Sequence, residues 1–220
     1  MAGFSDDLAS IVPLLKDIPR RWDGKPCILE MKDRDFQWKQ MEWWAFYFEM
    51  LCHDHLREVL RMPGDTDGRC TWDGTGHINW DFKAKAIKTD SHSLILNDKS
   101  SMDASIEKHN EHGLLICLCD VEYNDKERTF QRWRESLQGG KSDYQVRREQ
   151  RTSTSRYRKT LAVPTELLFV QICDADLQRL GTMKQGRNSN DKDRPPKYMI
   201  NLSKCEDLIQ KTVKIGPPLL

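Results

Sequence analysis

Two aspartates and a lysine lie close together in CTWDGTGHINWDFKAKAIK, residues 70–88. This stretch predicts two short strands joined by a glycine-containing turn. Asp81 and Lys83 then share one face of the second strand, because side chains alternate along a strand. Asp73 precedes the turn and folds back beside them. Two carboxylates and one ammonium at one place are unfavourable unless a cation or an anionic substrate joins them. We therefore expect a divalent metal held against a phosphodiester.

Each of these groups has an expected role in phosphodiester hydrolysis. Asp73 and Asp81 offer hard oxygen ligands for Mg²⁺, and the backbone carbonyl of Phe82 offers another. Lys83 orients the attacking water or stabilises the phosphorane. Lys85 continues the same strand face and is expected to contact the scissile or a neighbouring phosphate. Mn²⁺ is expected to substitute for Mg²⁺.

The longest helical pattern, residues 34–60, precedes the hairpin and carries two glutamates within the apolar segment MEWWAFYFEM. Glu42 and Glu49 are seven residues apart, two helical turns, and so are expected to share a face. A carboxylate in apolar surroundings must be paired, neutralised or bound to a cation. We expect Glu42 to complete the metal site or to support its ligands. The alternative for either glutamate is pairing with a nearby Arg or Lys, or contact with solvent.

The chain after the hairpin predicts an alternation of strands and helices. The nearly continuous apolar run GLLICLCDVEY, residues 113–123, indicates a central buried strand. Further elements are expected as follows: a surface strand at 93–96, a helix at 126–137, a core strand at 165–172, a short helix at 174–180 and an edge strand at 197–202. This order indicates an α/β fold with a central sheet flanked by helices.

The sequence Asp73…Asp81-Phe82-Lys83 resembles the motif of the PD-(D/E)XK nucleases, in which an acid opens a hairpin and D/E-x-K follows on the next strand. A preceding helix with a buried glutamate is a further point of similarity. The chain departs from the family pattern at Trp72, where the family has proline. The spacing between the two acids is also short, so Asp65 or Asp67 is the alternative first acid.

The resemblance implies a restriction-endonuclease-like fold, with a mixed central sheet flanked by helices, in a single nuclease domain over residues 1–220. The size of the chain and the lack of an ATPase motif resemble type II restriction endonucleases of restriction–modification systems. Such an enzyme is a site-specific deoxyribonuclease that cuts double-stranded DNA at a short site. Two active sites on a palindromic site require a two-fold axis, so a homodimer is expected. The alternatives are a repair, modification-dependent or structure-dependent nuclease of the same fold, or a non-catalytic DNA-binding module.

The formal net charge is only +1, from 35 Lys and Arg residues against 34 Asp and Glu residues, so bulk charge does not indicate a nucleic-acid-binding protein. The basic residues are instead concentrated in two segments, 141–159 and 182–197. Arg and Lys track a polyanionic backbone, and Arg and Asn recognise purine edges. The candidate DNA-binding residues are Arg147, Arg148, Arg151, Arg156, Lys184, Arg187, Asn188 and Arg194.

No apolar run approaches the length of about 20 residues that spans a bilayer, so no membrane association is expected. The seven cysteines do not form the spacing of a small disulfide framework, and the histidines lack cysteine partners at zinc spacing. Reduced thiols favour a cytoplasmic protein. The resemblance to restriction enzymes implies a prokaryotic cell.

Overall fold

The computed structural model describes residues 3–63, 72–87, 93–141, 146, 159–186 and 193–217. The helices are α1 Phe4–Leu14, α2 Gly24–Asp33, α3 Trp43–Leu56, α4 Lys99–His109 and α5 Thr129–Leu137, with short 3-10 helices η2 Asp174–Arg179, η3 Leu202–Lys204 and η4 Glu206–Leu208. The strands are β1 Trp22–Asp23, β2 Gly74–Thr75, β3 Asn79–Ala86, β4 Ser93–Asp98, β5 Glu111–Glu122, β6 Leu161–Cys173, β7 Gly181–Met183, β8 Lys197–Asn201 and β9 Ile209–Lys214.

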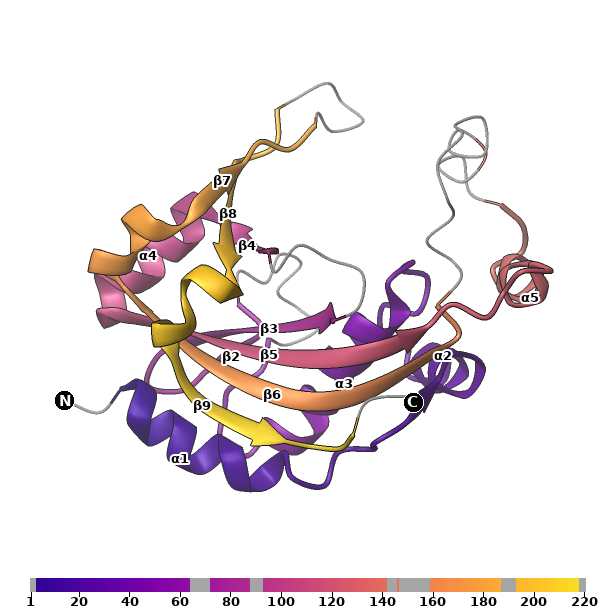
Figure 1. The fold of residues 1–220 in the computed structure, drawn as a ribbon, viewed down its shortest axis with the longest axis horizontal. Coiled ribbons are helices and arrows are strands. Elements are labelled where there is room, and N and C mark those ends of the chain that lie inside the picture. Colours follow the sequence, from indigo (N-terminus) through magenta and orange to yellow (C-terminus); the bar gives the residue numbers. More distant parts are fainter. Residues whose placement is uncertain are drawn as a thin grey trace.

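The central sheet has the strand order β1-β6-β5-β3-β2, and β9 also pairs with β6 (Figure 1). Strand β3 runs parallel to β5, whereas the other pairings in this sheet are antiparallel. The sheet is therefore mixed, and the predicted α/β fold with a mixed central sheet flanked by helices is confirmed. The predicted hairpin is also present as β2 and β3, with Gly74 opposite Trp80.

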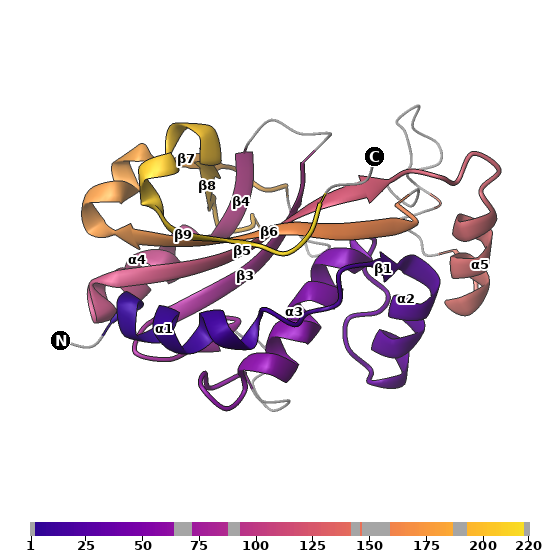
Figure 2. The ribbon, with the colours of Figure 1, turned by 60° about the horizontal axis from the view of Figure 1, so that its bottom comes forward.

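The two faces of the central sheet are covered differently (Figure 2). Helices α1 and α3 lie on one face. A second, antiparallel sheet of order β4-β8-β7 lies on the other, together with α4. Strand β5 contributes side chains to the cores on both faces of the sheet, because successive side chains of a strand point to opposite faces. Leu115 and Cys117 belong to the core beneath the helices, whereas Leu114 and Ile116 belong to the core beneath the second sheet.

Strand β3 follows the same alternation, but only one of its faces is apolar. Trp80 and Phe82 are buried in the core beneath α1 and α3. Asp81 and Lys83 point to the opposite side, where β5 places apolar residues. The prediction that Asp81 and Lys83 share one face of the strand is thus confirmed. These two charged side chains lie between the central sheet and the layer above it. Gly113 permits this packing, because a Cβ atom there would lie 2.6 Å from the Trp80 ring.

Two expected elements differ from the structure, and one helix was not expected. The predicted helix over 34–60 is limited to α3, because Asp35 and Gln37 have left-handed φ values of 50° and 42° that a helix cannot hold. The polar stretch after β4 contains the unpredicted helix α4, which buries Met102 and Ile106 against the second sheet. The predicted edge strand at 197–202 is β8, which lies between β4 and β7. Pro196 precedes this strand, so no ladder donor is missing.

Asp7 of α1 anchors the hairpin from the helical face. Its carboxylate accepts hydrogen bonds from the backbone N–H groups of His77 (2.9 Å) and Ile78 (3.2 Å) and from the Trp80 indole (2.8 Å). The His77 ring nitrogen Nδ1 lies 2.7 Å from the same carboxylate. Asp7 is only 4% exposed. A buried carboxylate supplied with this many donors holds the turn of the hairpin in a fixed position.

Candidate active site

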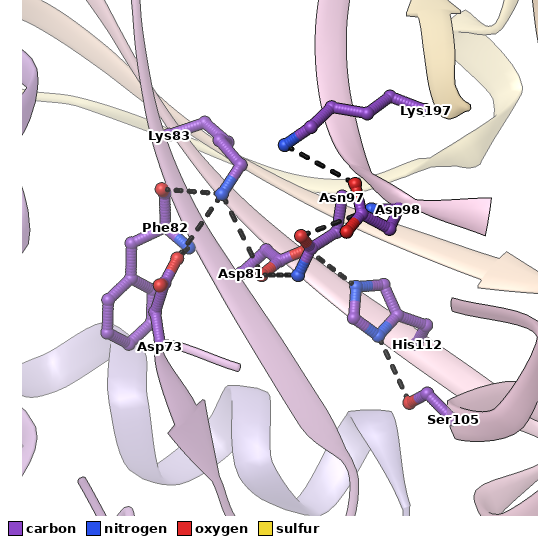
Figure 3. Close-up of polar contacts among 9 residues, drawn as sticks. All are labelled: Asp73, Asp81, Phe82, Lys83, Asn97, Asp98, Ser105, His112 and Lys197. Carbon is purple, nitrogen blue, oxygen red and sulfur yellow. Dashed lines mark hydrogen bonds and ion pairs between the residues drawn. The ribbon is translucent and has the colours of Figure 1, made fainter. Parts of the chain in front are cut away.

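The Lys83 ammonium lies among three oxygen atoms of the hairpin (Figure 3). Its Nζ atom is 3.2 Å from the Phe82 carbonyl oxygen, 3.3 Å from Asp73 Oδ2 and 3.7 Å from Asp81 Oδ1. These are three of the four groups that the sequence predicted as metal ligands; the fourth is Glu42. We call Asp73, Asp81, Phe82 and Lys83 the Lys83 centre. The convergence expected from the hairpin pattern is present in the structure, with the ammonium at the point of convergence.

Asp73 forms the exposed edge of this centre. Its side chain is 21% exposed and that of Lys83 is 24% exposed, so solvent reaches both. The carboxylate accepts a 2.6 Å hydrogen bond from the Phe82 backbone N–H, which ties the start of the hairpin to β3. Burial and the nearby Asp81 charge raise the pKa of Asp73 above its ordinary value, although Lys83 opposes this shift.

Asp81 is the buried member, with 1% of its side chain exposed. Burial alone would raise its pKa, but the positive charge of Lys83 and a hydrogen bond from His112 outweigh burial and hold the pKa below its ordinary value. His112 Nε2 lies 3.3 Å from Asp81 Oδ2, and Asn97 Nδ2 donates to Asp81 Oδ1 at 3.2 Å. The lowered pKa favours the ionised form of Asp81, and the two hydrogen bonds fix the orientation of its carboxylate.

A chain of hydrogen bonds supports Asp81 from behind. The Thr75 hydroxyl donates to the Asn79 amide oxygen at 3.1 Å, and the Asn79 amide N–H donates to Ser105 Oγ at 3.0 Å. Ser105 Oγ is 3.2 Å from His112 Nδ1. An ionised carboxylate only accepts, so the hydrogen between His112 and Asp81 lies on Nε2. The network consequently holds the His112 ring with its protonated nitrogen, Nε2, facing Asp81.

Sequence reasoning did not assign roles to His112, Asn97 or Ser105. His112 has the same parity as Leu114 in β5, so its side of the sheet was readable from the alternation of that strand. Asn97 and Ser105 reach Asp81 and His112 from β4 and α4. These two elements belong to the layer over the central sheet. No local pattern in the sequence indicates that contact.

Glu49 of α3 belongs electrostatically to the Lys83 centre. Burial and the neighbouring charge of Asp73 raise its pKa to about 8. In turn, the carboxylates of Asp73, Asp81 and Glu49 outweigh burial and raise the pKa of Lys83, so the ammonium stays charged. Lys83 thus interacts electrostatically with three carboxyl groups, of which Glu49, with a pKa of about 8, is largely protonated at neutral pH.

The structure corrects the prediction for Glu42. Its carboxylate pairs with the Lys159 ammonium at 2.6 Å and accepts from the Trp44 indole at 3.0 Å. Glu42 is the residue before the first helical residue of α3, with φ −86° and ψ 54°, so it does not continue the helical face that carries Glu49. Seven residues of helix also correspond to about 10 Å. Glu42 therefore lies apart from the metal site expected of it, and Glu49 is the glutamate that approaches the hairpin.

Lys85 follows Lys83 on the same face of β3, as expected. Its Nζ atom donates to the Ser93 carbonyl at 2.9 Å, and the residue is only 6% exposed. The structure thus uses this ammonium to join β3 to β4. Its contact with a phosphate stays a prediction.

The predicted DNA-binding residues are only partly within the described chain. Lys184 and Arg194 are exposed, next to β7 and β8. The remaining predicted residues lie outside the described residues: Arg147, Arg148, Arg151, Arg156, Arg187 and Asn188. The alternative first acids, Asp65 and Asp67, also lie outside the described residues. In Figure 1 the β7–β8 pair and α5 stand at opposite ends of the molecule, with β3 and β5 between them.

The oxygen set at the Lys83 centre suits Mg²⁺ in chemical type. Two carboxylates and one carbonyl are hard ligands, and Mg²⁺ in proteins keeps several waters besides one or two carboxylates. Within the described residues, no three His, Cys, Asp or Glu side chains form a group able to hold a metal. Asp73 and Asp81 beside a single ammonium favour a bound divalent ion. Asp73, Asp81 and the Phe82 carbonyl would hold such an ion, and these are the oxygens that now contact the Lys83 ammonium.

Comparison with known proteins suggests no function for this chain. No protein-family model, curated protein or solved structure matches this chain. Among the helices that the structure describes, none is long and apolar enough to cross a membrane.

Proposed function

We propose that this protein is a Mg²⁺-dependent type II restriction endonuclease that hydrolyses double-stranded DNA at a specific short site. The observation that supports this proposal is the Lys83 ammonium among the oxygens of Asp73, Asp81 and Phe82. Hydrolysis of a phosphodiester needs a cation at the phosphate, an aligned water and a positive group for the developing charge. The Lys83 centre contains groups for all three tasks.

Lys83 supplies the positive charge in this mechanism. Its raised pKa keeps the ammonium protonated throughout the neutral range. A phosphate oxygen that enters at the exposed Asp73–Lys83 edge takes up one of the ammonium's hydrogen bonds, and the ammonium then stabilises the negative charge that develops there. The same group can hold the attacking water by its remaining hydrogens.

Asp81 and Asp73 have different tasks. Asp81 is ionised and held by His112 and Asn97, so it presents its free lone pairs in one direction. Asp73 is partly exposed and lies where substrate enters. When bound by these two carboxylates and the Phe82 carbonyl, Mg²⁺ would neutralise the phosphate and lower the pKa of a bound water. His112 acts as a positioning residue, because it contacts Asp81 and not the substrate.

The remaining parts of the proposal concern partners and location. The partner is double-stranded DNA, with Lys184 and Arg194 as described candidates for backbone contact. A homodimer supplies one active site for each strand. The protein acts in the cytoplasm of a prokaryotic cell, without membrane contact.

Digestion of a sequenced plasmid by the purified protein, in Mg²⁺ and in Mn²⁺, tests the proposal. Sequencing the ends of the products reveals the site and the stagger. We expect discrete fragments from the wild type. Lys83→Ala and Asp81→Asn should lower kcat/KM by about 10³-fold, since each removes a group that acts on the developing charge or holds the metal. The exposed lysine variant Lys16→Ala serves as the matched control and should cleave like the wild type.

Three outcomes would contradict the proposal in different ways. Smeared products or nicks confined to unusual DNA structures would indicate a repair or structure-dependent nuclease. Binding of DNA without cleavage in either metal would indicate a non-catalytic module. Cleavage by Lys83→Ala at the wild-type rate would reject the mechanism while leaving a nuclease elsewhere in the chain.

A further inference from the structure

A polar cavity lies near the Lys83 centre, between the hairpin and α4. Its volume is about 430 Å³, within the range of about 300–1,000 Å³ typical of small-ligand sites. We call it the Arg61–Lys108 cavity, after the two cations in its lining. The remaining lining is one aromatic ring, Trp72, and small polar side chains with one alanine: Thr75, Asn79, Ser100, Ser101, Ala104 and Ser105. None of the described residues that line it carries a carboxylate.

Within the described part of the chain, neither the Arg61 guanidinium nor the Lys108 ammonium of this cavity pairs with a carboxylate. Ser100 and Ser101 also lie in the first turn of α4, where backbone N–H groups lack partners within the helix and the helix dipole is positive. Two cations and a helix start around one cavity favour an anion.

The other side of the same helix has the opposite chemistry. A cavity of about 890 Å³ there is lined by Asp103, Glu107 and Asp174, with no Lys or Arg among its described lining residues. Helix α4 therefore separates a cationic cavity from an acidic one. This segregation argues against a merely solvated surface for the cationic side, because Lys108 directly follows Glu107 in the chain yet lines the other cavity.

The cavity is connected to the Lys83 centre through β3. Asn79 and Asp81 share a face of this strand and are two residues apart, a distance of about 6.6 Å. Ser105 in the cavity wall contacts His112, which contacts Asp81. DNA advances about 3.4 Å per nucleotide along each strand. The cavity wall at Asn79 is thus about two nucleotides from Asp81 and about four nucleotides from Lys83, measured along the strand.

We propose that the Arg61–Lys108 cavity binds one deoxynucleoside monophosphate unit, with its phosphate between Arg61 and Lys108 and its base against Trp72. The Trp72 ring packs against His112 at 5.1 Å between ring centroids, and Trp72 also lines the cavity. Stacking on an aromatic ring accepts any base. The hydroxyls of Ser100 and Ser101 can bond the base edge or the sugar. The assignment of this unit to a DNA strand rests on the proposed nuclease function; the nucleotide site itself does not.

A titration with deoxyadenosine monophosphate tests the site directly. The full chain is labelled with 5-fluorotryptophan, and the ¹⁹F resonance of Trp72 is identified by its loss in Trp72→Phe. We expect the nucleotide to shift this resonance and to saturate it in the millimolar range or below. Inorganic phosphate should compete for the site. The double variant Arg61→Ala/Lys108→Ala should bind at least about tenfold more weakly, because both charge-assisted hydrogen bonds are lost.

Two controls isolate the cavity. Glu107→Gln changes the neighbouring residue on the acidic side of α4, and Lys16→Ala removes an exposed cation elsewhere. Both should bind the nucleotide like the wild type. An unmoved Trp72 resonance at millimolar nucleotide would overturn the proposal, as would unchanged binding by the double variant.

Single-stranded and duplex 12-mers distinguish the source of the nucleotide. A stronger shift of Trp72 by an oligonucleotide than by the monophosphate, lost in the double variant, supports a unit of a DNA strand. A shift by the monophosphate alone supports a free nucleotide ligand. Cleavage of DNA without any Trp72 shift would refute the nucleotide site but not the nuclease function. A Trp72 shift in a protein that never cleaves DNA would refute the nuclease function but not the nucleotide site.

Discussion

A buried carboxylate lies on each face of strand β3: Asp7 of α1 on the helical face and Asp81 of β3 itself on the other. The groups that contact these two carboxylates differ. On the helical face, Asp7 meets two backbone N–H groups, an indole and a histidine ring. On the opposite face, Asp81 shares the Lys83 ammonium with Asp73, and Glu49 adds a third carboxylate. Donors surround a single acid in the first region, whereas acids outnumber cations in the second.

This difference fits a structural role for Asp7 and the proposed catalytic role for the Lys83 centre. A carboxylate whose acceptors are filled contributes to stability and has little left to offer a ligand. Carboxyl groups gathered around one ammonium repel one another when ionised; this repulsion adds to burial in raising the pKa of Asp73 and Glu49, and a bound cation would relieve it. Perturbed pKa values of this kind cluster at functional sites. Neutralising an acid should therefore have opposite effects on stability in the two regions.

The largest expected effect is a loss of stability on removal of Asp7. Asp7→Ala leaves several buried donors without an acceptor, and we expect the free energy of unfolding to fall by about 3 kcal/mol. Urea denaturation followed by circular dichroism measures this change. Asp17→Ala, an exposed acid beyond the end of α1, should change it by less than about 0.5 kcal/mol. An Asp7→Ala loss as small as that of the control would remove the distinction between the regions.

The next effect is a pH dependence from Glu49. Its pKa is raised from 4.5 to about 8, so between these values the folded state holds a proton that the unfolded state releases. The Glu49 contribution to stability is therefore fully present below pH 4.5 and is lost as pH rises toward 8.

Glu49→Gln should flatten this dependence and be more stable than the wild type at pH 8. Urea denaturation at a series of pH values between 5 and 8 gives the slope for each protein. Glu58→Gln, an exposed change just after α3, should keep the wild-type slope. A slope that is identical in all three proteins would show that Glu49 is ionised normally in the folded state.

Asp73→Asn should stabilise the folded protein at pH 8, as Glu49→Gln does, but by a smaller amount. Burial and Asp81 raise the pKa of Asp73, so its ionisation opposes folding, and asparagine keeps an oxygen that can accept the Phe82 N–H. We expect a modest rise in the urea midpoint at pH 8 together with a loss of DNA cleavage. A clear fall in the midpoint would place Asp73 with Asp7, as a carboxylate that holds the fold.

The smallest effect is expected at Glu42. Its pair with Lys159 is partly exposed, at 30% and 12% respectively, so Glu42→Gln should change the free energy of unfolding by no more than about 1 kcal/mol. Cleavage by Glu42→Gln should stay near the wild-type rate, whereas Glu49→Gln should cleave more slowly. The reverse order of rates would return Glu42 to the active site.

The sequence by itself determined the hairpin, the central buried strand and the side of β3 on which each residue lies. These features depend on a period of two and on turn residues, which are local properties. The convergence of Asp73, Asp81 and Lys83 followed from the same local geometry, because all three belong to one hairpin. The α/β class followed from the order of the predicted elements.

Only the tertiary structure decided what surrounds this hairpin. Glu42 and Glu49 look alike in the sequence, and the start of α3 at Trp43 separates them, because a residue outside the helix does not keep its face. His112, Asn97 and Ser105 meet at Asp81 through the parallel pairing of β3 with β5 and the placement of β4 and α4 over the sheet. Contacts of that kind join residues distant in the chain, and no local pattern encodes them. The hairpin itself brings Asp73, Asp81 and Lys83 together, whereas tertiary contacts decide their hydrogen-bond partners and shift their pKa values.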